Sequence, residues 1–369
     1  MENKKHYNEE TTTNNEELIR EQKVRYGETL YQKISNSEPA KNLKRSIKRI
    51  KNSKRKRLTA IAILTFVIVY GLFSLFISLN EKYWNIKGVP KWHELFEAAG
   101  FSTPAYKGFH GDIAVHFIDV GQGDSALVII DDVAMLIDGG EYSASPKVIN
   151  YINSLEIDKL DYVIASHPHS DHIGSLHRVI DEFGVDTLVM PEVSEEMTPI
   201  TSSYIKMIES ADECGAKIKY AEVGDIYSIA EDCTLEILGP VADYEDYNNY
   251  SIVCRLKYKE TSFLFTGDIE EQAERDILDR DIDVSATVLK VAHHGSSTSS
   301  VKKFIQSVDP EYAVISAGAP NDYGHPHKET LKLFELLEIE VLRTDLQEDI
   351  ILFSDGEDIT VVADRRIPQ

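Results

Sequence analysis

Hydrophobic and polar positions alternate in short blocks along the C-terminal two-thirds of the chain. Apolar runs of strand length are separated by polar, turn-rich stretches and by segments with helical periodicity. The predicted strands lie at 113–119, 126–130, 133–137, 160–165, 187–190, 218–221, 234–238, 251–258, 262–265, 286–291, 312–316, 340–343 and 349–353. The predicted helices lie near 146–155, 270–280, 301–307 and 327–337. This order predicts an α/β domain over 111–369. Two sheets sandwiched between helix layers fit it, although the pattern alone does not dictate that architecture.

A different pattern occupies residues 58–80 (LTAIAILTFVIVYGLFSLFISLN), which contain no charged side chain. At about 1.5 Å of rise per residue, a helix of this length crosses the hydrocarbon core of a bilayer. A buried helix is rarely apolar on all faces over such a length, and a signal peptide usually has a shorter leader and a shorter apolar region. We therefore expect a single transmembrane anchor helix.

Basic residues cluster on the N-terminal side of this apolar run. Lys41–Arg57 contains ten Lys and Arg residues and no Asp or Glu, and positive flanks stay in the cytoplasm. The expected organisation is a polar, basic cytoplasmic region over 1–57, the anchor, a linker over 81–110 with a short helix, and an extracytoplasmic domain over 111–369. The protein is thus expected in the cell membrane as a single-pass chain. The alternative use of the basic stretch is binding to DNA or RNA.

Net charge separates the same two parts of the chain. Of 39 Lys and Arg and 62 Asp and Glu, residues 1–58 contain 16 and 8, which leaves residues 59–369 with 23 and 54, a net charge of −31. A body this acidic repels nucleic acid at long range unless cations or a local basic patch compensate. The charge therefore argues against a general DNA-binding surface, but not against a metal-centred pocket. The three cysteines show no C-x-x-C spacing, which argues against a disulfide framework.

The strongest chemical signal is the segment Ser166–His172, with the sequence SHPHSDH, directly after a predicted buried strand. Imidazoles at His167 and His169 can converge on one cation from an extended loop, and Asp171 and His172 can hold a second cation beside it. Four nitrogen and oxygen ligands in six residues suit Zn²⁺, Mn²⁺ or Fe²⁺ better than Ca²⁺ or Mg²⁺. Solvated loop histidines are the alternative, and this spacing disfavours them.

Two later segments offer the remaining ligands of a two-metal site. Asp268 follows the apolar strand Phe263–Phe265 and is the natural bridging carboxylate, although it could instead cap the next helix. His293 and His294 follow the apolar stretch Leu289–Ala292. One of these two histidines should complete the second metal site, and the other should meet the substrate or shuttle a proton.

These motifs together resemble the metallo-β-lactamase-fold domain of the ComEC type, found in competence (DNA-uptake) proteins and related extracellular hydrolases. The resemblance covers 113–362, about two-thirds of the chain, and the motifs occur in the family's order with similar spacings. The matching segments are Phe117–Ser125, Leu136–Gly140, Ser166–His172, Asn248–Val253, Phe265–Asp268, His293–Ser296 and Asn321–Pro326. The resemblance implies an α/β fold of the metallo-β-lactamase type, a four-layer αββα sandwich, preceded here by the single transmembrane helix.

The sequence departs from the family pattern in two ways. Many members of the wider superfamily have another metal-binding histidine before the bridging aspartate, but no histidine lies between His177 and Asp268. The Asn248–Asn249 stretch falls in that interval, so the first metal site is expected to be weaker, completed by water or partly occupied. The second departure is the single anchor helix, which leaves no room for a transport channel, so the chain is not itself a DNA translocase.

The roles expected of these residues follow from a two-metal hydrolase. Two divalent cations, Zn²⁺ or Mn²⁺, held about 3.5–4 Å apart would supply hydroxide at neutral pH. Asp268 would bridge them. The ligands of the first site would be His167 and His169, and those of the second would be Asp171, His172 and His294. The catalytic residues would be Asp171, His293 and His325. Of these, the two histidines would stabilise the oxyanion or protonate the leaving group. The aspartates Asp119, Asp124 and Asp138 are expected to orient ligands or to shape turns.

The function expected from the sequence is a membrane-anchored, extracytoplasmic, metal-dependent hydrolase, with phosphodiesterase or nuclease activity as the leading prediction. Two cations neutralise a phosphoryl group well, and the resemblance points the same way. The substrates in view are DNA, RNA or a phosphodiester-bearing envelope polymer, with no obligate protein partner. The alternatives are a carboxylic ester, lactone or β-lactam hydrolase of the same fold, or a surface module that holds metal without turnover.

Overall fold

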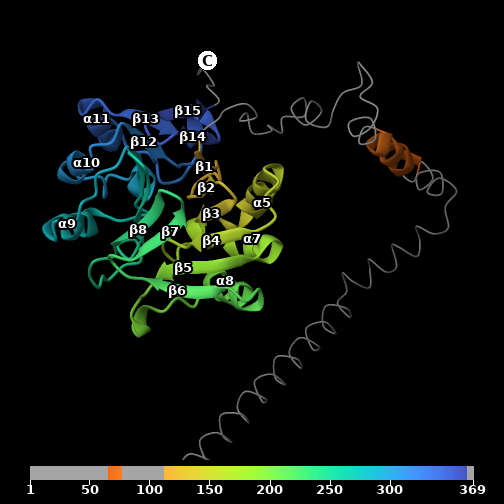
Figure 1. The fold of residues 1–369 in the computed structure, drawn as a ribbon, viewed down its shortest axis with the longest axis horizontal. Helices are drawn as coiled ribbons and strands as arrows, with labels where there is room; N and C mark the ends of the chain where they lie inside the picture. Colours follow the sequence, from red (N-terminus) through yellow and green to blue (C-terminus); the bar gives the residue numbers. More distant parts are fainter. Residues whose placement is uncertain (1–64, 77–111, 364–369) are drawn as a thin grey trace, which may run out of the picture. The chain divides into compact units, whose positions relative to one another are not determined.

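The structure is a computed structural model that describes residues 65–76 and 112–363 (Figure 1). The chain divides into two compact units, 1–101 and 102–369. In the first, residues 65–76 form a helix, whereas the rest of the predicted anchor, the predicted cytoplasmic region 1–57 and the predicted linker 81–110 lie outside the described residues. Among the described residues, no helix combines the length and the hydropathy that a bilayer crossing requires.

In the second unit, the described residues form two sheets. The strand order of the first, eight-stranded sheet is β15 (Ile359–Ala363), β14 (Ile350–Ser354), β1 (Ile113–Phe117), β2 (Ala126–Ile130), β3 (Val133–Ile137), β4 (Leu160–Ile164), β5 (Val185–Pro191) and β6 (Lys217–Ala221). Strands β3 to β6 run parallel, whereas β15 to β3 pair in antiparallel fashion.

The second sheet has seven strands. Their order is β13 (Glu340–Arg343), β12 (Tyr312–Ile315), β11 (Val288–Lys290), β10 (Thr261–Phe265), β9 (Val253–Tyr258), β8 (Cys233–Gly239) and β7 (Ile226–Ala230). Strands β10 to β13 are parallel, and β7 to β10 are antiparallel. The carboxyl ends of parallel neighbours meet at one edge of a sheet, where binding residues are commonly presented.

Helices cover the outer faces of both sheets (Figure 1). Apolar residues of α5 (Ser145–Ser154), α7 (Leu176–Phe183) and α8 (Ser202–Glu213) pack with outward side chains of the first sheet. Residues of α9 (Glu271–Asp279), α10 (Lys302–Val308) and α11 (Lys328–Leu336) do the same on the second sheet. The short elements are η2 (Tyr142–Ala144), α6 (Ser170–Ile173), η3 (Glu195–Met197), η4 (Ala292–Gly295) and α12 (Thr344–Gln347). The predicted α/β class is confirmed, with two sheets between helix layers.

The main core lies between the two sheets and follows from the period-two pattern of the strands. Ile113, Val115 and Phe117 of β1 alternate with residues of the opposite face and enter this core together with inward residues of the second sheet. The ring of Phe117 stacks on that of Phe265 from β10, with centroids 6.1 Å apart. The sheets therefore hold their strand ends in a fixed relation, which positions the loops of the site.

The sequence analysis did not predict the helices α6, α7, α8 and α12, the strands β7 and β15, or the short η2, η3 and η4. Helix α7 does carry the helical signature, since Leu176, Val179 and Ile180 are buried at helical spacing. It begins only four residues after His172, so its apolar positions were read as part of the histidine segment. Strand β15 lies at a sheet edge and contains no buried residue, so its pattern resembles a solvent-exposed loop.

Candidate metal centre

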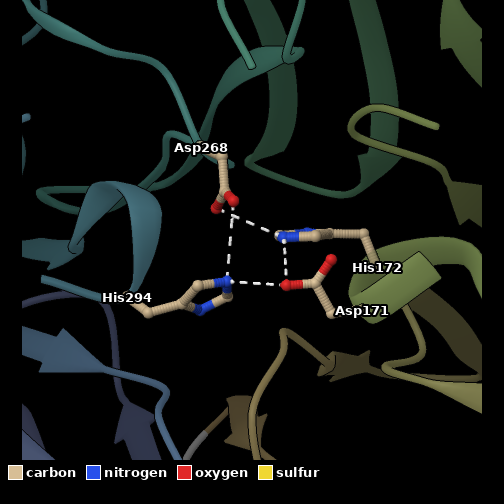
Figure 2. A group of neighbouring side chains, drawn as sticks. All are labelled: Asp171, His172, Asp268 and His294. Carbon is tan, nitrogen blue, oxygen red and sulfur yellow. Dashed lines mark ion pairs between the residues drawn. The ribbon is translucent and has the colours of Figure 1, made fainter. Parts of the chain in front are cut away.

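Four side chains with metal-binding chemistry converge at one point of the second unit. Asp171, His172, Asp268 and His294 each offer a ligand atom, and these atoms lie within 4.8 Å of one another. His172 Nε2 lies 3.2 Å from Asp268 Oδ1, and His294 Nε2 lies 3.3 Å from Asp171 Oδ2 and 3.5 Å from Asp268 Oδ2. Figure 2 shows the imidazole nitrogens and carboxylate oxygens pointing toward a common centre. We call these four residues the tetrad.

The tetrad is assembled by loops at the carboxyl ends of three strands. The loop after β4 leads into α6 and carries Asp171 and His172, the turn after β10 carries Asp268, and η4 after β11 carries His294. Gly267 makes the turn after β10 possible, because its φ is +50° and a Cβ there would lie 2.8 Å from the side chain of Ser251. Ser251 in turn accepts a hydrogen bond from the backbone of Asp268 (3.0 Å).

His172 is held on its far side by a carboxylate. Its Nδ1 lies 2.8 Å from Asp138 Oδ2, at the end of β3, so the Nδ1–H donates there and Nε2 faces the other members of the tetrad. Asp138 also accepts hydrogen bonds from the backbone and the hydroxyl of Ser166 (2.8 and 2.6 Å). Asp138 therefore fixes the orientation of the His172 ring.

His294 is held in a similar way from the second sheet. Its Nδ1 lies 3.0 Å from the carbonyl oxygen of Ser316 and 3.3 Å from Asp124 Oδ1. Asp124 is itself paired with the buried ammonium of Lys290 at 2.7 Å. These contacts leave Nε2 of His294 directed at Asp171 and Asp268. Asp119, by contrast, accepts from the backbone of Gly121 and shapes the turn.

The tetrad fits a divalent cation. His172 Nε2, His294 Nε2 and Asp268 Oδ1 are buried, and none has a hydrogen-bond partner among the described residues. Unpaired buried polar atoms are unfavourable unless a ligand satisfies them. Ligand atoms about 2.0–2.2 Å from a transition-metal ion lie roughly 3–3.5 Å from one another, which is the spacing of three of the four contacts in the tetrad. The donor set of two imidazoles and two carboxylates suits such an ion.

The carboxylates and imidazoles of the tetrad shift the pKa values of one another, in each case toward the charged form. Burial alone would lower the pKa of His172, but the carboxylates of Asp268 and Asp138 hold it well above its usual value. Burial would likewise lower the pKa of His294, yet Asp268 and Asp124 raise it to about 9. The pKa of Asp268, which burial would raise, is held well below its usual range by His172 and His294. A cation that binds here therefore replaces protons.

His167 and His169 form a second pair beside the tetrad. His167 Nε2 lies 3.0 Å from His169 Nδ1 and 3.8 Å from Asp268 Oδ2. Asp268 thus lies between this pair and His172, whose ring lies 4.1 Å from that of His167. Burial and the neighbouring charge of His172 lower the pKa of His167 well below its usual value, so its nitrogen stays free of a proton. The pair and Asp268 provide three ligand atoms for a further ion.

A cavity of about 290 Å³ opens over both groups of ligands. It is lined by Gln122, His169, Ser170, Asp171, Asn248, Asp268, His293, His294, Tyr323 and His325. His293 Nδ1 lies 3.3 Å from Glu270 Oε1, and its Nε2 lies 3.9 Å from Asp268 Oδ2. The ring of His325 lies 5.5 Å from that of His293. Six of the eight candidate metal-binding and catalytic residues therefore line one cavity, and the other two, His167 and His172, are buried beside it and face Asp268.

Some residues of the site were not singled out from the sequence. Lys290 is buried in β11 and pairs with Asp124, and Glu270 contacts His293. A lysine within an apolar strand was a usable signal, because buried ammonium groups almost always have a partner. Glu270 gave no signal, since it is one of many acidic residues at the start of a helix.

Comparison with known proteins agrees with this geometry. A family profile described as Metallo-beta-lactamase superfamily matches residues 118–319. The chain is 35% identical over 252 residues to ComE operon protein 3 of Bacillus subtilis (strain 168), covering 63% of this chain and 32% of that protein. It is 29% identical over 264 residues to Competence protein ComA of Neisseria gonorrhoeae, covering 70% and 35%. The chain thus spans about a third of the length of these relatives.

Among solved structures, the chain is similar to the Rm3 metallo-beta-lactamase, with 17% identity, a TM-score of 0.36, and coverage of 50% of this chain and 76% of that one. The profile match extends over more than half of the chain and includes the histidine segment, Asp268 and His294. The protein therefore belongs to the metallo-beta-lactamase superfamily of hydrolases and is related to competence proteins.

Proposed function

We propose that the protein is a metal-dependent phosphodiesterase with two divalent cations. The observation that carries this proposal is the position of Asp268 between two sets of histidines. Its Oδ1 faces His172 at 3.2 Å, and its Oδ2 lies 3.5 Å from His294 and 3.8 Å from His167. A carboxylate placed in this way can bridge two cations, and paired cations stabilise both the attacking and the leaving oxygen of a displacement at phosphorus.

The residues that would hold the two ions are those already described. His167, His169 and Asp268 would hold the first, and the tetrad would hold the second. Zn²⁺ or Mn²⁺ is the proposed metal. When bound, the cations supply Lewis-acid chemistry and hydroxide at neutral pH.

Two further histidines of the cavity are placed to act on the substrate. Burial and the neighbouring His294 and His293 lower the pKa of His325 to about 4, so at neutral pH it is an uncharged hydrogen-bond donor that can stabilise developing negative charge. His293 is oriented through its Nδ1 by Glu270 and by Thr298 Oγ1, each at 3.3 Å. Its Nε2 faces the cavity and is the group we assign to protonate the leaving oxygen.

Nucleic acid is the favoured phosphodiester, and an envelope polymer is the other substrate in view. Relatives named as a competence protein and as a recombination protein support the first. None of the described residues that line the cavity is a lysine or an arginine. The negative charge of a substrate would therefore be compensated by the cations and histidines of the site rather than by a basic surface.

The same proposal includes a membrane anchor formed by residues 58–80. The uncharged run and the ten basic residues before it support a single crossing with the N-terminus in the cytoplasm and the metal centre outside. Protease treatment of intact cells that make the full chain tests this directly. Removal of the 111–369 region by external protease is expected, and its complete resistance, with degradation only after lysis, would contradict the proposed orientation.

The activity is tested with the full chain in detergent, stripped of metal and reloaded with Zn²⁺ or Mn²⁺ separately. Hydrolysis of bis-p-nitrophenyl phosphate, DNA and RNA is expected, with nitrocefin unchanged. His177→Ala is a matched control, because His177 is a histidine of the same segment of chain that stacks on Tyr142 instead of facing the cavity. Cleavage of nitrocefin alone would overturn the phosphodiesterase proposal. Binding of metal without turnover of any substrate would favour a surface binding module.

A further inference from the structure

The first metal position lacks one ligand. His167, His169 and Asp268 provide three ligand atoms, and no histidine lies between His177 and Asp268 to provide a fourth. The loop between β8 and β9 reaches the cavity in that interval and contains two adjacent asparagines, Asn248 and Asn249. The surroundings of these two side chains differ, and the difference indicates a function for one of them.

Both polar side-chain atoms of Asn249 form hydrogen bonds that hold the loop. Its Oδ1 accepts hydrogen bonds from the backbone of Glu270 (3.0 Å) and of Ala273 (3.2 Å) at the start of α9, and its Nδ2 donates to Asp246 Oδ2 (2.8 Å). On the other side, the hydroxyl of Tyr247 donates to the carbonyl oxygen of Met197 (2.8 Å). The backbone around position 248 is therefore fixed from both sides.

Asn248 uses its backbone but not its side-chain oxygen. Its carbonyl oxygen accepts a hydrogen bond from the backbone of Ser251 (2.9 Å). Its Oδ1 is buried and has no hydrogen-bond partner among the described residues, and the side chain lines the same cavity as His169 and Asp268. The neighbouring Tyr247 ring stands edge-on to His169, with centroids 5.8 Å apart. The loop thus places an unsatisfied carbonyl oxygen next to the incomplete first position.

We infer that Asn248 Oδ1 is the ligand that completes the first metal position in place of a histidine. This inference rests on the two-ion centre of the proposed function. Amide oxygens are established ligands of divalent cations, and a buried acceptor without a donor gains most from such a bond. A neutral oxygen binds Zn²⁺ less well than an imidazole does. The first position is therefore the weaker of the two, and the choice of residue 248 sets its affinity.

The test is titration of the metal-free full chain in detergent with Zn²⁺ alone, followed by calorimetry and by native mass spectrometry. The wild type is expected to bind two ions with unequal affinity. Asn248→Ala should weaken the second binding step by at least about tenfold and leave the first within about twofold. Asn248→His should strengthen the second step by a similar factor. Tyr250→Phe is the matched control on the same loop, because the Tyr250 hydroxyl contacts Asp243 at 3.4 Å and the residue does not line the cavity, and it should change neither step.

Equal affinities for the second ion in the wild type and in both Asn248 variants would overturn the inference. The strengthened binding expected of Asn248→His cannot arise from misfolding, and the first binding step reports whether the Asn248→Ala chain is folded. Because the measurement is binding, it is separate from activity. If Asn248→Ala loses the second ion but the wild type cleaves no phosphodiester, the ligand assignment stands and the proposed function fails.

Discussion

The two halves of the candidate metal centre, the tetrad and the pair His167 and His169, differ in how firmly their side chains are held. In the tetrad, both histidines are fixed from behind, His172 by Asp138 at 2.8 Å and His294 by the carbonyl oxygen of Ser316 at 3.0 Å. In the other half, His167 has only the hydroxyl of Ser166 at 3.1 Å behind it, and His169 contacts His167 itself. Outer partners fix the tautomer of a ligand and raise its basicity. The tetrad is thus a preorganised site, whereas the pair depends on the ion to organise it.

Replacement of the carboxylate shared by both halves should have the largest effect. Asp268→Asn keeps the size of the side chain but removes the negative charge that both ions need. We expect the hydrolysis of bis-p-nitrophenyl phosphate to fall by more than about 100-fold, since even the loss of an outer partner reduces affinity or activity roughly 10–100-fold. Initial rates and metal content measured together are the check. A variant with full metal content and a wild-type rate would remove Asp268 from the centre.

Loss of a ligand from the less organised half should affect that half alone. His169→Ala is expected to reduce the affinity of one Zn²⁺ ion by about 100-fold, so that this ion is lost from the full chain. This is the upper end of the fall in metal affinity seen when a residue that hydrogen-bonds a metal ligand is replaced. The other ion should keep its affinity within about twofold, because the described hydrogen bonds and ion pairs include none between a tetrad side chain and the His169 side chain, and the backbone bond from His172 to the His169 carbonyl oxygen (3.1 Å) is kept in the variant. Native mass spectrometry counts the ions. Simultaneous loss of both ions would show that the halves do not bind independently.

Weakening of the support behind His172 should reduce the affinity of the tetrad. Asp138→Asn keeps a hydrogen-bond acceptor but loses the charge, so a decrease of roughly tenfold is expected for the tighter ion. Ser166→Ala removes one neutral donor to Asp138 but leaves the charge of that carboxylate behind His172, so binding should weaken by only about fivefold. Competition with a chelator of known affinity measures both variants. A larger effect for Ser166→Ala than for Asp138→Asn would contradict the difference drawn between charged and neutral support.

The smallest effect on metal binding is expected for a buried acid outside both halves. Burial raises the pKa of Glu274 from 4.5 to about 7, although the backbone amides of Val301 and Ser300 donate to it. The folded chain therefore binds more protons than the unfolded chain between these values, and its stability falls as pH rises through this window, by roughly 3 kcal/mol from this residue. Below pH 4.5 the contribution is fully present.

Glu274→Gln should remove this part of the pH dependence and leave both metal affinities unchanged. Urea unfolding of the metal-free chain between pH 4.5 and 8 measures the effect. The difference between variant and wild type isolates Glu274, since the histidines of the centre titrate in both. Parallel stability curves for the two proteins would show that Glu274 has an ordinary pKa in the folded state.

Much of the centre could be predicted from the sequence because its ligands lie in short segments. His167, His169, Asp171 and His172 lie within six residues, so their proximity follows from local geometry, and Asp268 and His294 follow apolar strands whose ends were recognisable. Sequence could not reveal Lys290 as the partner of Asp124, because the two residues are far apart in the chain and meet only when the sheets pack. Glu270 and His293 follow the neighbouring strands β10 and β11 of one sheet, so their contact depends on strand pairing that the sequence pattern does not specify.

The sequence by itself determined the α/β class, the order along the chain of the segments that carry the candidate ligands, and the uncharged run at 58–80. Only the tertiary structure decided which atom of each ligand faces the centre, since that depends on hydrogen bonds such as the one from His172 to Asp138 across two strands. It also separated two adjacent asparagines that the sequence cannot distinguish. The Oδ1 of Asn249 accepts hydrogen bonds from the backbone at the start of α9, whereas the Oδ1 of Asn248 has no hydrogen-bond partner among the described residues and its side chain lines the cavity. Local spacing fixes which groups are available, and the packing of the two sheets fixes which of them remain free to bind.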